Sequence, residues 1–360
     1  MSLPPSPDPH PDDDVTGEAP HRGSGDPAPG ETPGAPAATE PPGAHPLPEA
    51  SAELSADALI HREKPAPKRG WRRALFTMSR GYLNPGESRI ELRRQELEAT
   101  VRRATLPDAP QAITVLGTQE GAGATTTALA LGAALTKQRG DRGIVLDADA
   151  QHPPLSDRMP PQAPPQSGLG ELLHNPGEVT RYSDFAAYTA QATTGLDLLS
   201  SHAGELDTAV LSAADFQLVA EVAERFYSLH LVDAGSDVMQ PAVPAILARS
   251  DQLVLATPPS RDGAVSAANV LDEVGDLGYT HLAETSLVTL TRAPAGTGES
   301  SELDDIQEQL TRRCRNALRI PNDPHLEAHG AVDPDRMRLS SVIGYLELAV
   351  DVLTALPRRG

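Results

Sequence analysis

A glycine-rich turn followed by two threonines has residue types and spacing suited to chemistry. The turn runs from Gly117 to Thr126 and reads GTQEGAGATT. Glycines let backbone N–H groups approach an anion closely, and the N-terminus of a following helix attracts negative charge. A threonine hydroxyl at the start of that helix is a typical Mg²⁺ ligand. The turn therefore predicts a phosphate-binding loop, with Thr125 as the Mg²⁺ ligand and Thr126 as a phosphate contact.

Three carboxylates lie where apolar stretches end. Asp147 and Asp149 close the run GIVLDAD, and Asp233 closes LHLVD. Ligands of open parallel sheets bind at the carboxyl ends of the strands, so we expect these side chains to lie beside the loop. Asp233 is placed as a Walker-B carboxylate, which holds Mg²⁺ through water.

The elements that position these residues alternate between apolar strands and helices, which indicates a parallel sheet. We expect an α/β, P-loop NTPase-like fold: a mostly parallel sheet with helices on both faces. The expected strands span 112–117, 143–148, 195–200, 228–233, 251–257, 285–291 and 316–320; the expected helices span 125–138, 167–174, 212–226, 240–249, 262–277, 301–314 and 340–355. The long connection, 150–166, is rich in proline, and we interpret it as a surface switch or binding loop.

Composition divides the chain into three regions. Residues 1–66 form a Pro/Ala/acidic tail that we expect to be disordered, because it has too little apolar surface to offset its chain entropy. Residues 67–110 form a basic, partly helical lead-in, and residues 111–357 form the P-loop domain. Trp71 lies in a basic, apolar stretch of the lead-in that could pack on the domain, bind a partner or contact lipid.

The second half of the lead-in predicts a helix, reading ESRIELRRQELEATVRR over 87–103. Ser88 is expected to cap it, with Glu91 three residues further on. The apolar residues Ile90, Leu97 and Val101 share one face, and Glu98 is expected to pair with Arg102.

Charge and cysteine content limit the functions available to the chain. The net charge of −20 argues against a DNA-binding role. No signal peptide or apolar stretch long enough to span a membrane is apparent, so we expect a cytoplasmic protein with at most peripheral membrane contact. The only cysteine, Cys314, is interpreted as a buried structural side chain.

Together these motifs resemble the MinD/ParA family of deviant-Walker P-loop ATPases. The resemblance rests on the loop, the Asp-x-Asp strand, LVDAGSD, DQLVLATPPSRDGAVSA and RIPNDPHLEAHGAVD. The lead-in and the late PNDPHLEA segment are also similar to the MinD-like ATPases associated with type VII secretion. The resemblance implies ATP or ADP with Mg²⁺ as cofactors. It implies nucleotide contacts at Gly121, Ala122, Gly123, Ala124, Thr125, Thr126 and Arg292, metal contacts at Thr125, Asp147 and Asp233, and a catalytic role for Asp149 in positioning the attacking water.

The loop departs from that family at both of its lysines. Gln119 and Ala124 occupy the lysine positions, and Glu120 replaces a glycine. Loss of the lysine beside the threonines removes a charge-assisted contact of about 1.5–3 kcal/mol. Lys137 lies about three turns along the expected helix and cannot return to the loop, so a replacement cation would be an arginine such as Arg261 or one from the lead-in.

Two functions therefore remain open. The chain is either a nucleotide-binding regulator of a type VII secretion or positioning system with impaired ATP hydrolysis, or a catalytically inactive scaffold that acts by binding partners. Protein partners are expected in both cases, through the tail or the Trp71 segment, and a homodimer is an alternative. The sequence leaves ATPase activity undecided.

Overall fold

The computed structural model describes residues 77–78, 88–149, 155–159, 161–163, 165, 167–200, 211–294, 301–327 and 331–356. Of the two units, Met1–Arg62 and Glu63–Gly360, the first lies wholly outside the described residues. The predicted disordered tail, residues 1–66, and the Trp71 segment also lie outside them. The description below concerns the second unit.

A nine-stranded sheet forms the centre of this unit, in the order β3-β4-β5-β2-β6-β1-β7-β8-β9. The strands from β5 to β9 along this order run parallel, whereas β4 is antiparallel to both of its neighbours, β5 and the edge strand β3. The predicted α/β, mostly parallel fold is confirmed, although the two short antiparallel strands were not anticipated. The strands are β1 (Gln111–Gly117), β2 (Gly143–Asp147), β3 (Pro161–Ala163), β4 (Ala190–Ala192), β5 (Asp197–Leu199), β6 (Leu229–Asp233), β7 (Gln252–Thr257), β8 (Leu287–Ala293) and β9 (Asn316–Pro321).

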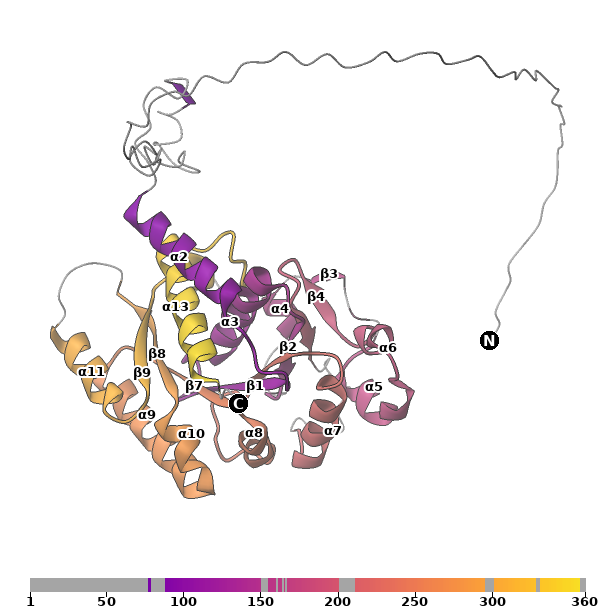
Figure 1. Cartoon of the computed structure of the whole chain (residues 1–360). Coiled ribbons are helices and arrows are strands. Elements are labelled where there is room, and N and C mark those ends of the chain that lie inside the picture. The colour runs from indigo at the N-terminus through magenta and orange to yellow at the C-terminus, as the bar shows by residue number, and fades with distance from the viewer. Residues whose placement is uncertain are drawn as a thin grey trace, which may run out of the picture. The chain divides into compact units, whose positions relative to one another are not determined.

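Helices cover both faces of the sheet, as Figure 1 shows. Because successive strand residues point to opposite faces, Ile113 and Val115 of β1 join one apolar cluster and Leu116 joins the other. The first cluster includes side chains from α2 (Arg89–Arg103), α3 (Ala124–Arg139) and α13 (Leu339–Ala355). The second includes side chains from α5 (Leu169–His174), α6 (Tyr182–Ala186), α7 (Ala213–Ala223), α8 (Val243–Arg249), α9 (Arg261–Val274), α10 (Thr280–Glu284) and α11 (Ser301–Thr311).

Helix α2 brings the second half of the lead-in onto the domain. Ser88 caps the helix by accepting a hydrogen bond from the Glu91 backbone N–H at 3.2 Å, as predicted. Leu97 and Val101 are buried, whereas Ile90 is 45% exposed and does not belong to the packed face. The helix contacts both α13 and α3.

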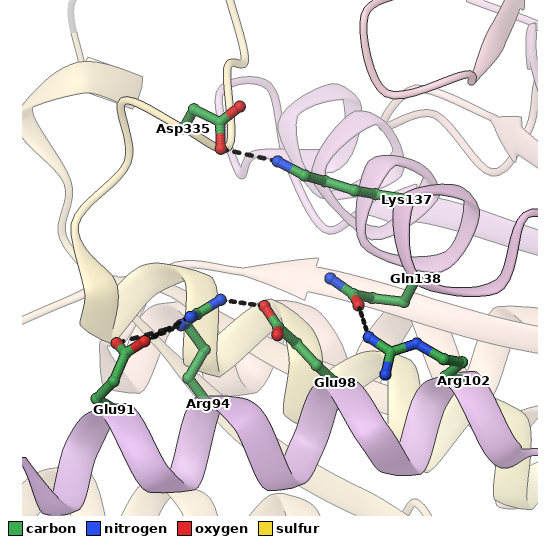
Figure 2. A network of polar contacts seen from close by, with 7 residues as sticks. All are labelled: Glu91, Arg94, Glu98, Arg102, Lys137, Gln138 and Asp335. Carbon is green, nitrogen blue, oxygen red and sulfur yellow. Dashed lines mark hydrogen bonds and ion pairs between the residues drawn. The ribbon is translucent and has the colours of Figure 1, made fainter. Parts of the chain in front are cut away.

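The predicted Glu98–Arg102 pair is wrong. Arg94 lies between Glu91 and Glu98 and binds both, while Arg102 donates to Gln138 of α3 at 3.1 Å (Figure 2). Arg94 pairs with the glutamates one turn before it and one turn after it along α2. Because Glu98 is already paired, Arg102 contacts α3 instead.

Lys137 is also committed to a structural contact. Its Nζ lies 2.7 Å from an oxygen of Asp335, in the segment that leads into α13 (Figure 2). Lys137 does not line the cavity over the glycine-rich loop, as its position along α3 predicted.

Cys314 is buried behind α11, where its thiol donates to the Leu310 carbonyl oxygen. Burial raises its pKa to about 11, so the thiol is protonated and unreactive at neutral pH. This confirms its structural interpretation. None of the helices among the described residues combines the length and the hydrophobicity that a membrane span requires.

Candidate nucleotide site

The glycine-rich loop joins β1 to α3 and is closed by backbone hydrogen bonds. The Gly117 N–H donates to the Gly235 carbonyl after β6, and the Thr118 N–H donates to the Ala256 carbonyl in β7. Gly121 and Gly123 have φ angles of 73° and 94°, a left-handed conformation that favours glycine. Such a backbone presents successive N–H groups toward a concave anion site.

The end of β8 holds the loop from its other side. Between Leu290 and Ala293 the register of β8 against β9 shifts, and within that irregularity Arg292 has a φ of 55°. Thr291 Oγ1 donates to the Ala122 carbonyl at 2.7 Å, and Arg292 Nη2 donates to the Gly121 carbonyl at 2.9 Å. Both side chains therefore fix the loop through its carbonyl oxygens.

The three predicted aspartates meet at the carboxyl edge of the sheet. The strand register pairs Asp147 of β2 with Asp233 of β6. The Asp149 N–H donates to Asp147 Oδ1 at 3.2 Å, and all three residues are buried. Burial, followed by the charge of Asp233, raises the pKa of Asp147 well above its ordinary value.

Gly235 allows this close approach. A Cβ atom built at this position would lie 2.4 Å from a carboxylate oxygen of Asp149, and the glycine has a φ of 69°. The loop after β6 therefore needs a glycine to accommodate the aspartate of the neighbouring strand.

A cavity of about 700 Å³ opens over the loop. That volume lies within the usual range for small-molecule sites. The predicted contacts Gly121, Ala122, Gly123, Ala124, Thr125, Thr126, Asp149 and Arg292 line it, together with Glu120 and the segment 320–323. Asp147 and Asp233 lie beside these residues without lining the cavity themselves.

The far wall of the cavity comes from β9, α12 (Pro324–Glu327) and α13. The 320–326 segment supplies Ile320 and Leu326 as apolar lining residues and Asn322 as a polar one. Asn322 donates to Glu327 at 2.7 Å, while its Oδ1 is buried and accepts no hydrogen bond from the described residues. Tyr345 of α13 also lines this wall and was not anticipated, because its helix appears from sequence to be core.

The structure tests Arg261 as a replacement cation, whereas the lead-in arginines before Ser88 lie outside the described residues. Arg261 does not line the cavity; it is 78% exposed and pairs with Glu302 at 2.8 Å. Arg93 and Arg94 of the lead-in pair with glutamates. The arginines that line the cavity are Arg292 and Arg158, and the latter donates to Thr126 Oγ1 at 3.0 Å.

The residues present are suited to Mg²⁺ with a phosphate. The described residues contain no group of three or more His, Cys, Asp or Glu side chains arranged to hold a metal ion. Mg²⁺ bound to a nucleotide commonly uses one or two carboxylates, with phosphate and water completing its shell. Burial, and then the neighbouring charge of Asp233, raise the pKa of Asp147, and a divalent cation bound there would favour its ionised form.

Comparison with solved structures places the fold in one class. A ParA family ATPase from Chlorobium tepidum aligns with a TM-score of 0.54 and 18% identity, over 67% of this chain and 98% of that chain. MinD in a MinC:MinD cell division complex from Aquifex aeolicus aligns with a TM-score of 0.51 and 17% identity, over 66% and 94%. An ATP complex of a McdA variant from Cyanothece gives a TM-score of 0.51 and 16% identity, over 70% and 99%. The chain has the fold of the ParA/MinD ATPases.

Sequence comparison adds a more particular relative. The chain is 30% identical over 299 residues to the ESX-1 secretion-associated protein EspI, found in two strains of Mycobacterium tuberculosis. The alignment covers 82% of this chain and 44% of EspI, so the chain spans less than half the length of that relative. No family model matches the chain. The chain is a distant homologue of EspI with a ParA/MinD-like fold.

Proposed function

We propose that this chain is a MinD/ParA-like protein that binds ATP or ADP with Mg²⁺ and hydrolyses ATP slowly or not at all. The observation that carries the proposal is the cavity of about 700 Å³ at the carboxyl edge of the sheet, lined by the glycine-rich loop on one side and the 320–323 segment on the other. The phosphates would lie over Gly121 to Thr126, and the base would lie toward Ile320 and Leu326. Asn322 Oδ1 would accept a hydrogen bond there.

Within this site the residues have separate tasks. Thr125, Asp147 and Asp233 would hold Mg²⁺, which when bound neutralises phosphate charge. Asp149 lines the cavity and would orient a water molecule, while Thr291 and Arg292 keep the loop carbonyls turned away from the anion. Slow hydrolysis follows from Ala124, because a methyl group cannot stabilise charge that develops on the terminal phosphate.

The cellular role proposed is regulation of a type VII secretion or positioning system. The homology to EspI, a secretion-associated protein, supports the first setting, and the ParA/MinD fold supports the second. Such a role requires protein partners, and the tail, the Trp71 segment and a second copy of the chain are the proposed contacts. The net charge disfavours DNA as a partner.

A catalytically inactive scaffold is the second candidate. The observations that favour it are the buried Ala124 at the lysine position and Glu120 in the cavity lining. In that case the fold would present partner surfaces without a nucleotide cycle.

Calorimetric titration of the full chain with Mg-ATP and Mg-ADP separates the two candidates. The proposal expects saturable binding of both nucleotides, and phosphate release in a separate turnover assay that is slow or absent and is lowered further by Asp149→Asn. Absence of binding favours the scaffold. Phosphate release at about 1 s⁻¹ or faster, the lower end of ordinary enzyme turnover, would contradict impaired hydrolysis.

A further inference from the structure

The backbone of Arg158 is fixed by the packing of residues that precede and follow it in the sequence. It ends the short helix α4 (Leu155–Arg158), in the proline-rich connection after β2. Leu155 and Met159 are buried in the apolar cluster of α3 and α13. The Arg158 carbonyl accepts a hydrogen bond from the Val332 N–H. The side chain therefore starts from a fixed backbone position and extends into the cavity over the loop.

The guanidinium of Arg158 has few hydrogen-bond and ion-pair partners among the described residues. Nη2 donates to Thr126 Oγ1 at 3.0 Å, whereas Nε is buried and finds no acceptor in the described part of the chain. No carboxylate of the described residues forms an ion pair with Arg158. Arg158 as a whole is half-buried, an arginine does not deprotonate in a protein, and a cation partly withdrawn from water is stabilised by a counter-ion. The arrangement indicates a site for an anion supplied from solution.

Arg292 lies at the opposite end of the same loop. It binds the Gly121 carbonyl, while Arg158 binds the Thr126 hydroxyl, so the two guanidiniums mark the two ends of the anion-binding backbone. No ion pair with a described carboxylate is found for Arg292 either. By contrast, Arg249 and Arg261 pair with glutamates outside the cavity.

We propose that Arg158 is the cation for the terminal phosphates of a bound nucleoside di- or triphosphate, replacing the lysine that is absent at Ala124, with Arg292 assisting from the other end of the loop. This inference rests on the proposed nucleotide-binding function. A planar guanidinium can donate two parallel hydrogen bonds to phosphate oxygens, which a lysine cannot do. Thr126 orients the guanidinium through the single bond described above.

The test compares full-length wild type with Arg158→Gln by calorimetric titration with Mg-ATP, Mg-ADP and AMP. Loss of one charge-assisted contact weakens binding of Mg-ATP and Mg-ADP by about tenfold to a hundredfold. AMP has no β- or γ-phosphate. Its affinity therefore changes by less than about threefold, which is the range expected of a substitution that removes no contact to the ligand. Arg261→Gln is the matched control, because that arginine is exposed and lies outside the cavity, and it leaves all three affinities unchanged.

A rescue variant and a fold check complete the experiment. Arg158→Gln combined with Ala124→Lys regains most of the lost affinity for Mg-ATP, because the new lysine restores a cation at the same phosphates. Circular dichroism melting checks the fold, and if Arg158→Gln does not fold, Arg158→Lys keeps the charge and gives a smaller loss for Mg-ATP. Unchanged Mg-ATP and Mg-ADP binding in a folded Arg158 variant would overturn this inference while the proposed function stands. A wild type that binds no nucleotide would overturn both.

Discussion

Replacing Asp147 by asparagine is expected to stabilise the nucleotide-free protein. Asp147 and Asp233 are paired across adjacent strands, and both are buried. Asparagine has nearly the same shape and keeps an oxygen that can accept the Asp149 N–H bond. The substitution therefore removes one negative charge with little change in packing.

The size of the effect follows from the strand spacing. Adjacent strands lie about 4.8 Å apart, and two unit charges at that distance repel by about 3.5 kcal/mol at an effective dielectric constant of about 20. The raised pKa of Asp147 means that protonation already relieves part of this repulsion. A gain of about 1–3 kcal/mol, at roughly 2–4 °C per kcal/mol for a domain of this size, raises the melting temperature by about 2–12 °C.

Differential scanning calorimetry in buffer with EDTA measures this shift. Asp276→Asn is the control, because Asp276 is exposed and its removal relieves no buried repulsion. With Mg-ATP present the ranking reverses, since the variant has lost a carboxylate for Mg²⁺ and gains less from ligand binding. A nucleotide-free Asp147→Asn protein that melts below wild type would refute the reasoning, because it would mean that the carboxylate makes net favourable contacts.

Two further predictions concern the loop and the core. Ala124→Lys places an ammonium group at the phosphate site and tightens Mg-ATP binding by about tenfold or more, measured by calorimetry; an affinity equal to or below that of wild type would show that position 124 does not face the phosphates. His230 is buried, and burial lowers its pKa to about 4, so the neutral form is favoured in the folded state. The unfolded chain binds more protons between pH 6.5 and 4, and this residue therefore costs about 3 kcal/mol of stability as the pH falls through that window. Urea unfolding at pH 7 and pH 4.5 should show a smaller loss for His230→Gln than for wild type, and equal losses would contradict the assignment.

Most of the sheet could be predicted from sequence because its parallel strands are continuous apolar runs. Each of the predicted strands appears within a few residues of its expected bounds. The edge strands β3 and β4 were not predicted, since each has only three residues and β3 begins at a proline. Strands this short carry too little periodicity to separate them from loop.

The loop and its aspartates were predictable for a similar reason, since local sequence sets where each strand ends. Arg158 was not, although the proline content of its connection indicates a surface switch or binding loop. Its role depends on Leu155 and Met159 packing into a distant cluster, which fixes the direction of the side chain. Arg261 was the wrong arginine, because no local pattern indicates that it pairs with Glu302, which is 41 positions away.

The position of the two cavity arginines has a consequence for folding. A lysine inside a glycine-rich loop is close in sequence to the backbone that binds phosphate, so such a site acquires its positive charge as soon as the loop forms. Here the contacts that bring charge to the loop join residues 32 and 171 positions apart along the chain. The anion site can therefore be completed only after the chain has folded as far as β8 and docked α4. Bound phosphate should accordingly protect both segments from hydrogen exchange together, and a fragment that ends before β8 should retain the loop sequence without its full affinity.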